Sequence, residues 1–242
     1  MTTDYQPKQF WEQRLSDRFS LQSVGHIGFS EAYNQRLYQR KKRCIEACLA
    51  EVDLAGKAVL DIGCGTGFFV KWYLEQGAKV CGLDITEVSV DRLRQTYAGE
   101  FYTQDITEPA YSLQGSAFDL VNMWDVIYHI VEPQRFEQAC KNIANSLKPG
   151  GLLLFTDWLG AEGDRLVAPH VQARCLSTYQ NFLPQLGFEL VQVYPLYGWL
   201  NQVHFKRFDN YLGGLYLWLD NRLEKISTEN LSLGLWRYQP PA

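Results

Sequence analysis

The sequence has 242 residues, 46% of them hydrophobic, which suits one large α/β domain with additions or at most two small domains. The formal net charge of -4 argues against a protein that binds nucleic acid through a basic face. The 6 cysteines form no C-x-x-C pair and no Cys/His metal cluster, no secretory signal precedes them, and no apolar run reaches the length of a membrane span. We therefore expect reduced thiols, no metal and a cytoplasmic protein without a membrane span.

The first 56 residues are expected to form a helical cap. Residues 6–18 have helical composition with Trp11 on the apolar side, and residues 24–29 look like a loop. Ser30 suits the N-cap of a long helix that carries Tyr33 and a basic segment over residues 36–43. This segment is either a solvated face or a site for an anionic ligand.

A glycine-rich turn follows the cap. The apolar run Ala58–Ile62 predicts a buried parallel strand, residues 63–67 read G-C-G-T-G, and Phe68–Glu75 is an amphipathic segment typical of a helix. This order brings backbone N–H groups close to a ligand, because glycine adopts positive φ and has no Cβ. A second strand, Ala78–Asp84, ends in a carboxylate at the spacing where an acid accepts hydrogen bonds from ribose hydroxyls.

Alternating strands and helices continue to the end of the sequence, which predicts an α/β fold. The turn Lys148–Gly151, K-P-G-G, is expected to precede the fifth strand. The expected strands are Phe101–Tyr102, Ala117–Met123, Leu152–Thr156, Phe188–Tyr194 and Leu231–Tyr238, and the expected helices are Glu87–Tyr97, Pro133–Leu147 and Leu176–Leu186.

Residues 196–230 carry an amphipathic pattern that Gly213-Gly214 could kink. The apolar stripe must be buried against the domain as a lid, against a second subunit in a homodimer, or against a membrane surface. Its members, at steps of three and four residues, are Phe205, Phe208, Leu212, Leu215, Leu219, Leu223 and Ile226.

The glycine-rich turn differs from a dinucleotide fingerprint, because Asp61 stands two residues before the first glycine and the glycines read G-x-G-x-G. Together with Asp84, these residues resemble the first motif of the class I (Rossmann-like) S-adenosylmethionine-dependent methyltransferases. The resemblance extends from Lys57 to Gly151, with the general layout to the end. It implies a three-layer sandwich with a mostly parallel seven-stranded sheet, divided into a cap (1–56), a core (57–195), a helical insertion (196–230) and the last strand (231–242).

The resemblance also implies S-adenosyl-L-methionine as cofactor, S-adenosyl-L-homocysteine as product, and a position for each cofactor-binding residue. Trp11 either faces the sulfonium or packs in the core. The implied positions are Asp61 near the methionine end, Gly63, Cys64 and Gly65 beneath the cofactor, Asp84 at the ribose, Ile85 on the adenine, Asp105 with Ile106 at the adenine amino group, and Met123 or Trp124 beside the sulfonium.

A hydroxyl acceptor needs a base, and His129 is the first candidate because it follows the fourth strand at the carboxyl edge of the sheet. Its alternative role is to line the pocket. Asp157, directly after the fifth strand, is the second candidate. Arg174 either binds an anionic substrate or pairs with a surface carboxylate. The candidates for the acceptor side are Tyr33, Trp158, His170, Arg174 and Trp199, and residues 163–175 could close over it.

The resemblance and the acidic, aromatic-rich composition together predict methyl transfer to a small molecule, with an oxygen of a biosynthetic metabolite as the first choice. The sequence N-M-W-D at residues 122–125 lacks the N/D-P-P motif typical of amino-group methylation. The alternatives are transfer to nitrogen or sulfur and a non-catalytic cofactor-binding protein. A nicotinamide oxidoreductase is disfavoured by the G-x-G-x-G turn.

Overall fold

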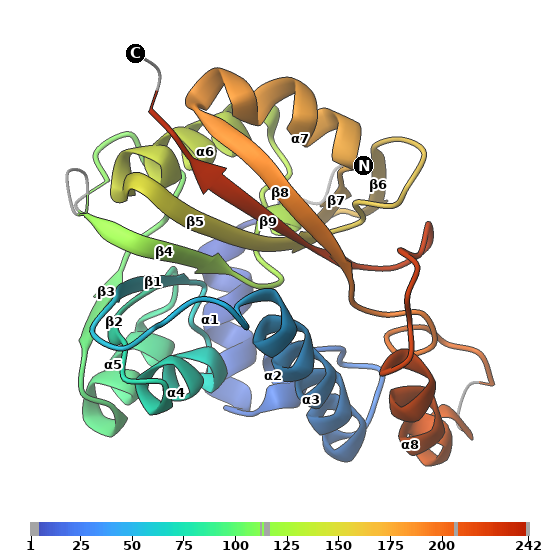
Figure 1. Ribbon diagram of the computed structural model, residues 1–242. Coiled ribbons are helices and arrows are strands. Elements are labelled where there is room, and N and C mark those ends of the chain that lie inside the picture. Colours follow the sequence, from blue (N-terminus) through green and yellow to red (C-terminus); the bar gives the residue numbers. More distant parts are fainter. Residues whose placement is uncertain (1–4, 112, 114–116, 206–207, 241–242) are drawn as a thin grey trace.

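The computed structural model describes residues 5–111, 113, 117–205 and 208–240. A seven-stranded sheet in the order β3-β2-β1-β4-β5-β9-β8 forms its centre, which confirms the predicted architecture (Figure 1). The first five strands run parallel, and β9 is antiparallel to both of its neighbours. The strands are β1 (Ala58–Ile62), β2 (Lys79–Asp84), β3 (Glu100–Thr103), β4 (Phe118–Met123), β5 (Leu147–Asp157), β8 (Phe188–Pro195) and β9 (Ser232–Tyr238).

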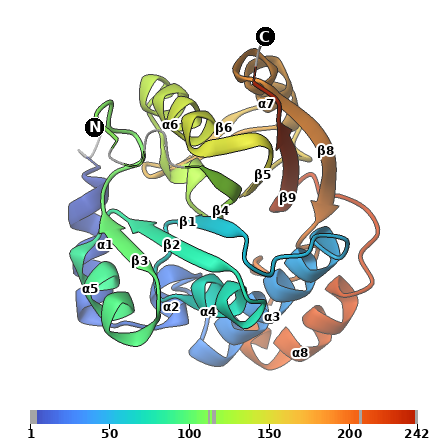
Figure 2. The same ribbon diagram turned by 60° about the vertical axis from the view of Figure 1, so that its left-hand side comes forward.

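Helices cover both faces of the sheet, which gives the predicted three layers (Figures 1 and 2). One face carries α1 to α5, and the other carries α6 and α7. Their bounds are α1 (Pro7–Asp17), α2 (Leu21–Val24), α3 (Glu31–Cys48), α4 (Phe68–Glu75), α5 (Glu87–Thr96), α6 (Pro133–Ser146) and α7 (Leu176–Phe182), followed by the short 3-10 helix η2 (Leu183–Leu186). None of the described helices combines the length and apolar character needed to cross a bilayer.

The two faces of β1 explain why this strand is apolar throughout. Val59 and Leu60 are both fully buried, and they pack into different core clusters on opposite sides of the sheet. Successive side chains of a strand point to opposite faces, so a strand covered on both faces needs apolar residues at consecutive positions.

The basic segment of α3 differs from the expected solvated face. Ser30 caps the helix as predicted, because its Oγ accepts a hydrogen bond from the N–H of Tyr33. Lys42 is exposed, but Arg40 and Lys41 are buried. The Arg40 guanidinium donates to the backbone oxygens of residues 195 and 196, so it fastens α3 to the chain that leaves β8.

Two segments of the core also differ from the sequence predictions. The K-P-G-G turn belongs to β5, because Leu147 already pairs with Phe118 before the register shifts. Residues 163–175 contain a hairpin of β6 (Arg165–Ala168) and β7 (Val171–Ala173) instead of a simple loop.

The amphipathic stripe of the insertion is only partly buried against the domain. The helix α8 covers Asp209–Asp220, and its buried residues are Asp209, Gly213, Tyr216 and Asp220, whereas Phe205, Phe208, Leu215 and Ile226 are exposed. The two carboxylates face inward because they accept hydrogen bonds from the backbone N–H groups of residues 199, 200, 204 and 205. Gly213 does not kink the helix but lets it approach α3, since a Cβ there would lie 2.8 Å from the Tyr33 ring. Residues 206 and 207 lie outside the described residues.

Candidate functional site

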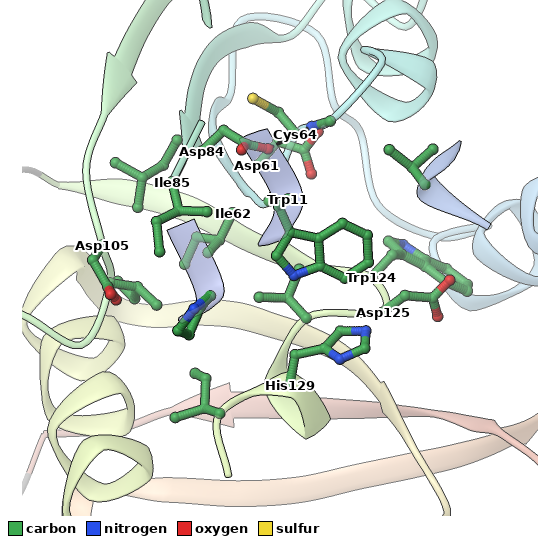
Figure 3. Close-up of a pocket in the computed structure, with 18 of the residues that line it drawn as sticks. Trp11, Asp61, Ile62, Cys64, Asp84, Ile85, Asp105, Trp124, Asp125 and His129 are labelled. Carbon is green, nitrogen blue, oxygen red and sulfur yellow. Dashed lines mark hydrogen bonds between the residues drawn. The ribbon is translucent and has the colours of Figure 1, made fainter. Parts of the chain in front are cut away.

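A cavity lies at the carboxyl ends of β1, β2 and β4, and α1 contributes Trp11 to its wall (Figure 3). Its empty volume is about 1120 Å³, including space open to solvent. The sequence-predicted residues that line it are Trp11, Asp61, Gly63, Cys64, Gly65, Asp84, Ile85, Asp105, Ile106, Trp124 and His129.

The glycine-rich turn forms the floor of the cavity. The N–H groups of Gly63 and Cys64 both donate to the backbone oxygen of Leu83, at 2.7 and 3.1 Å, which holds the turn against β2. Gly63 has φ +70°, and a Cβ there would lie 2.2 Å from Cγ2 of Val126. A side chain therefore does not fit at this position, and the bare backbone is left as a surface that a ligand can approach.

Two acidic residues of the cavity wall each begin a tripeptide of the same sequence, D-I-T. In Asp84-Ile85-Thr86 the Asp84 Oδ1 accepts from the backbone N–H and the hydroxyl of Thr86, at 2.9 and 2.7 Å. In Asp105-Ile106-Thr107 the same two bonds reach Asp105 Oδ1 at 2.8 and 2.7 Å. The strands β2 and β3 thus end in identical turns that fix two carboxylates at one edge of the sheet.

The second oxygen of each carboxylate keeps hydrogen-bonding capacity. Asp84 Oδ2 accepts from the N–H of Gly65 at 2.9 Å, and Asp105 Oδ2 accepts from Arg135 at 2.5 Å. An ionised carboxylate can accept about four hydrogen bonds, so each has room for one donor from a ligand. These residues fit the expected ribose hydroxyl and adenine amino group.

Asp61 is buried at the foot of the turn. Its Oδ1 accepts from Nδ2 of Asn122 at 2.6 Å, and Asn122 in turn accepts from the hydroxyl of Tyr73. Burial raises the pKa of Asp61 to about 7, although the Asn122 hydrogen bond opposes the shift. This carboxyl group can therefore change protonation near neutral pH.

Aromatic rings form much of the remaining wall. Trp124 stacks on Phe69 with ring centroids 4.8 Å apart, and Trp11 lies edge-on to His129 at 5.0 Å. Aromatic faces attract cations, so this lining suits a positively charged sulfonium as well as an apolar acceptor.

His129 presents an unprotonated ring nitrogen in the cavity lining. Its Nδ1 lies 2.7 Å from the backbone oxygen of His170. Because a carbonyl oxygen can only accept, this bond assigns the ring proton to Nδ1, and Nε2 has no hydrogen-bond partner among the described residues. Burial lowers the pKa of His129 to about 4, so the ring is neutral at pH 7 and Nε2 has a free lone pair.

Asp125 lines the cavity beside Trp124 and was missed by sequence reasoning. It has φ +56°, which is costly for a residue with a side chain. Lys41 donates to its Oδ2, and the hydroxyl of Thr156 lies 3.0 Å from its Oδ1. The signal in the sequence was an acid directly after the fourth strand, but nothing local indicated its partner on α3.

Asp157 lies outside this cavity. Its carboxyl group is fully buried and accepts from the Tyr179 hydroxyl at 2.5 Å and from the backbone N–H groups of Trp158 and Arg174. Burial raises its pKa to about 7. The group holds β5 to the hairpin, which makes it a poor candidate for a base that meets the acceptor.

The other predicted residues lie outside the cavity lining. Met123 is fully buried in the core, and Tyr33 is covered by α8. Trp199 is 46% exposed beside His204, at the insertion. Trp158 packs edge-on against Tyr128, His170 stacks behind His129, and Arg174 bonds backbone oxygens instead of a surface carboxylate.

Comparison with known proteins places these features in context. A family model described as a methyltransferase domain matches residues 33–193. A "Ubiquinone biosynthesis O-methyltransferase" of Idiomarina loihiensis is 36% identical over 107 residues, which are 43% of this chain and 43% of that relative. The chain thus spans less than half the length of the curated relatives it matches.

Two solved structures share the fold over nearly the whole chain. Magnesium protoporphyrin IX methyltransferase from Synechocystis PCC 6803, with bound SAM, has a TM-score of 0.64 at 16% identity and covers 99% of this chain and 100% of that one. The N-methyltransferase NodS from Bradyrhizobium japonicum WM9, in complex with S-adenosyl-L-homocysteine, has a TM-score of 0.60 at 15% identity and covers 95% and 98%.

Proposed function

Because the chain belongs to the methyltransferase-domain family, we propose that it transfers a methyl group from S-adenosylmethionine to an oxygen of a small biosynthetic metabolite. One observation carries the proposal: the glycine-rich turn, the two D-I-T carboxylates and a neutral histidine all line a single cavity. The acceptor reaches the cofactor at the edge of the sheet where α/β folds bind ligands.

The cofactor side of the cavity has a defined task for each residue. The bare backbone at Gly63 lies beneath the methionine portion of the cofactor. Asp84 accepts a hydrogen bond from a ribose hydroxyl, and Asp105 accepts one from the adenine amino group. The bound cofactor supplies an electrophilic methyl group on a sulfonium. The cavity walls contribute by holding the two reactants in line and by excluding water.

His129 is the proposed base on the acceptor side. Its Nδ1 proton is held by the His170 carbonyl, so Nε2 is left to accept the proton of the attacking hydroxyl. A histidine with a pKa of about 4 is a weak base, and it takes up the proton as the oxygen becomes cationic during methylation. Trp11 orients the ring from the side of α1.

Two observations support oxygen over nitrogen as the acceptor atom. The relatives with 34–36% identity are named O-methyltransferases, although the structural neighbours include two different N-methyltransferases. Residues 122–125 read N-M-W-D, and Asn122 is committed to Asp61 inside the protein. The amide oxygen and amino group of this residue are therefore occupied by structural hydrogen bonds.

The experiment that tests the proposal is a methylation assay with matched acceptors. Aromatic compounds that share one ring and differ in a hydroxyl, an amine or a thiol are incubated with S-adenosylmethionine, and S-adenosylhomocysteine and the methylated product are measured by mass spectrometry. We expect turnover with the hydroxyl compounds. Turnover confined to amines or thiols would overturn the proposal that oxygen is the acceptor atom. Cofactor binding without turnover of any compound would favour the non-catalytic alternative.

A further inference from the structure

The β6–β7 hairpin holds the turn that carries His129. The turn is the short 3-10 helix η1 (Ile127–His129), and β7 ends one residue before Arg174. Besides the bond from His129 Nδ1 to the His170 carbonyl, the two imidazole rings stack with an interplanar angle of 7°. The hairpin therefore touches His129 on its ring nitrogen and on its ring face.

Arg174 holds the same turn from inside the protein. Its Nη1 donates to the backbone oxygen of Ile127 at 3.3 Å, and its Nη2 donates to that of Ile130 at 2.6 Å. These two carbonyls stand on either side of His129 in the sequence. The planar fork of a guanidinium can hold two acceptors in a fixed relative position, which a lysine ammonium cannot do.

Burying the charged side chain of Arg174 costs free energy that packing alone does not explain. The side chain is 4% exposed, and its guanidinium lies over the Phe136 ring at 4.0 Å. No carboxylate lies within ion-pair distance of it in the part of the chain that the structure describes. A buried charge without an ionic partner is destabilising unless its hydrogen bonds are well placed.

We propose that Arg174 is a positioning residue that, together with the His170 carbonyl, holds His129 in the Nδ1–H tautomer with Nε2 free for the acceptor. The effect of this tautomer on catalysis rests on the proposed function, but the tautomer itself can be measured without turnover. When the fork is removed, the two carbonyls beside His129 lose their common anchor. The ring then leaves the His170 carbonyl, and the neutral imidazole shifts toward the Nε2–H form.

The test compares Arg174→Met with Arg165→Met. Methionine keeps an unbranched stem over Phe136 but donates nothing, whereas Arg165 stands on the same hairpin, is exposed and pairs with Glu229 at 3.4 Å. The ring nitrogens of His129, assigned by comparison with His129→Gln, are observed by ¹⁵N NMR at pH 7 without acceptor. We expect the Nδ1–H signature in the wild type and in Arg165→Met, and its partial or complete loss in Arg174→Met.

Kinetics provide the second readout. We expect kcat to fall about 10- to 100-fold in Arg174→Met, less than the roughly 10²- to 10⁴-fold attributed to general acid–base catalysis, because the base is misplaced and not removed. The dissociation constant of S-adenosylhomocysteine should change less than about twofold. If Arg174→Met does not fold, Arg174→Lys carries the test, because lysine keeps the charge but lacks the planar fork that fixes two carbonyls relative to one another. An unchanged His129 tautomer in a folded variant would overturn the inference, whereas full turnover in His129→Gln would overturn the role of His129 as base and leave the tautomer result standing.

Discussion

Lys41 on α3 and Asp125, two residues after β4, form an ion pair across 84 positions of sequence, with the lysine side chain 3% exposed and the aspartate 16% exposed. The pair joins the N-terminal helices to the wall of the cavity. It also fixes Asp125 in its left-handed backbone conformation, together with Thr156 on β5. Docking of α3 and the shape of the acceptor side are therefore coupled.

Lys41→Met is expected to destabilise the protein strongly. Removing one partner leaves a largely buried carboxylate without its cation, which costs about 3–5 kcal/mol. Lys42→Met is the matched control, because Lys42 is the next residue on the helix, is 47% exposed and is 3.9 Å from Glu46. Unfolding in urea measures both variants, and equal losses of stability would contradict a special role for the buried pair.

Asp84→Ala is expected to weaken the binding of S-adenosylhomocysteine by about 1–3 kcal/mol, through loss of a charge-assisted hydrogen bond and of the anchor of Gly65. Asp91→Ala, at an exposed site on α5, is the control and should bind normally. Titration calorimetry provides the comparison. An unchanged dissociation constant in the folded Asp84 variant would remove this carboxylate from the cofactor site.

Gly63→Ala separates steric exclusion from backbone strain when it is compared with Gly56→Ala. Both glycines have φ near +70°, but a Cβ at Gly56 meets nothing within 4 Å. We expect Gly56→Ala to lose about 1 kcal/mol of stability and to bind cofactor normally. Gly63→Ala should be less stable still and bind cofactor poorly, and the further change Val126→Ala should recover part of its stability. Equal behaviour of the two single variants would refute the close approach to Val126.

The stability of the protein should depend on the protonation of His129. Burial lowers its pKa from 6.5 to about 4, so between these pH values the unfolded chain binds a proton that the folded protein does not. The contribution of His129 to stability therefore decreases as the pH falls from 6.5 to 4 and is constant above that range. Relative to His129→Gln, the wild type should lose up to about 1.4 kcal/mol per pH unit there. Unfolding curves at several pH values measure this loss, and a pH-independent difference would count against a ring held neutral by desolvation.

Asp157→Asn is expected to retain turnover and to change stability instead. The carboxyl group lies outside the cavity and binds Tyr179 and two backbone N–H groups, and an amide can satisfy only part of this set. Thermal unfolding and kcat measured on the same preparation decide the point. A loss of turnover with unchanged melting temperature would return Asp157 to the catalytic site.

Local patterns made the centre of the fold predictable. The strand β1, the glycine turn and α4 follow from consecutive residues, and the helix α3 follows from its cap and its periodicity. The hairpin β6–β7 was missed because three of the four residues of β6 are exposed and show no alternation. The inward side of α8 could not be predicted from the stripe, because Asp209 and Asp220 are buried by their bonds to backbone groups in a preceding loop while part of the stripe stays exposed.

The residues of the candidate site also divide into those that could be predicted from local sequence and those that could not. Residues that bind through their own turn, such as Asp84 and Asp105, could be named from the sequence, because each acts beside its own strand. Asp125, Lys41 and Arg174 acquire their roles through partners that are 31 to 84 positions away. Such pairings depend on how the helices pack, and residue spacing carries no information about them.

The strand β9 follows every other strand of the sheet in sequence yet lies between β5 and β8. While the ribosome is still making residues 232–238, the two flanking strands have no neighbour on their facing edges, and those edges are open to pairing with another nascent chain. Aggregation during expression should therefore respond to substitutions in β9 more than to equally buried substitutions in β1, which gains both of its neighbours earlier in synthesis.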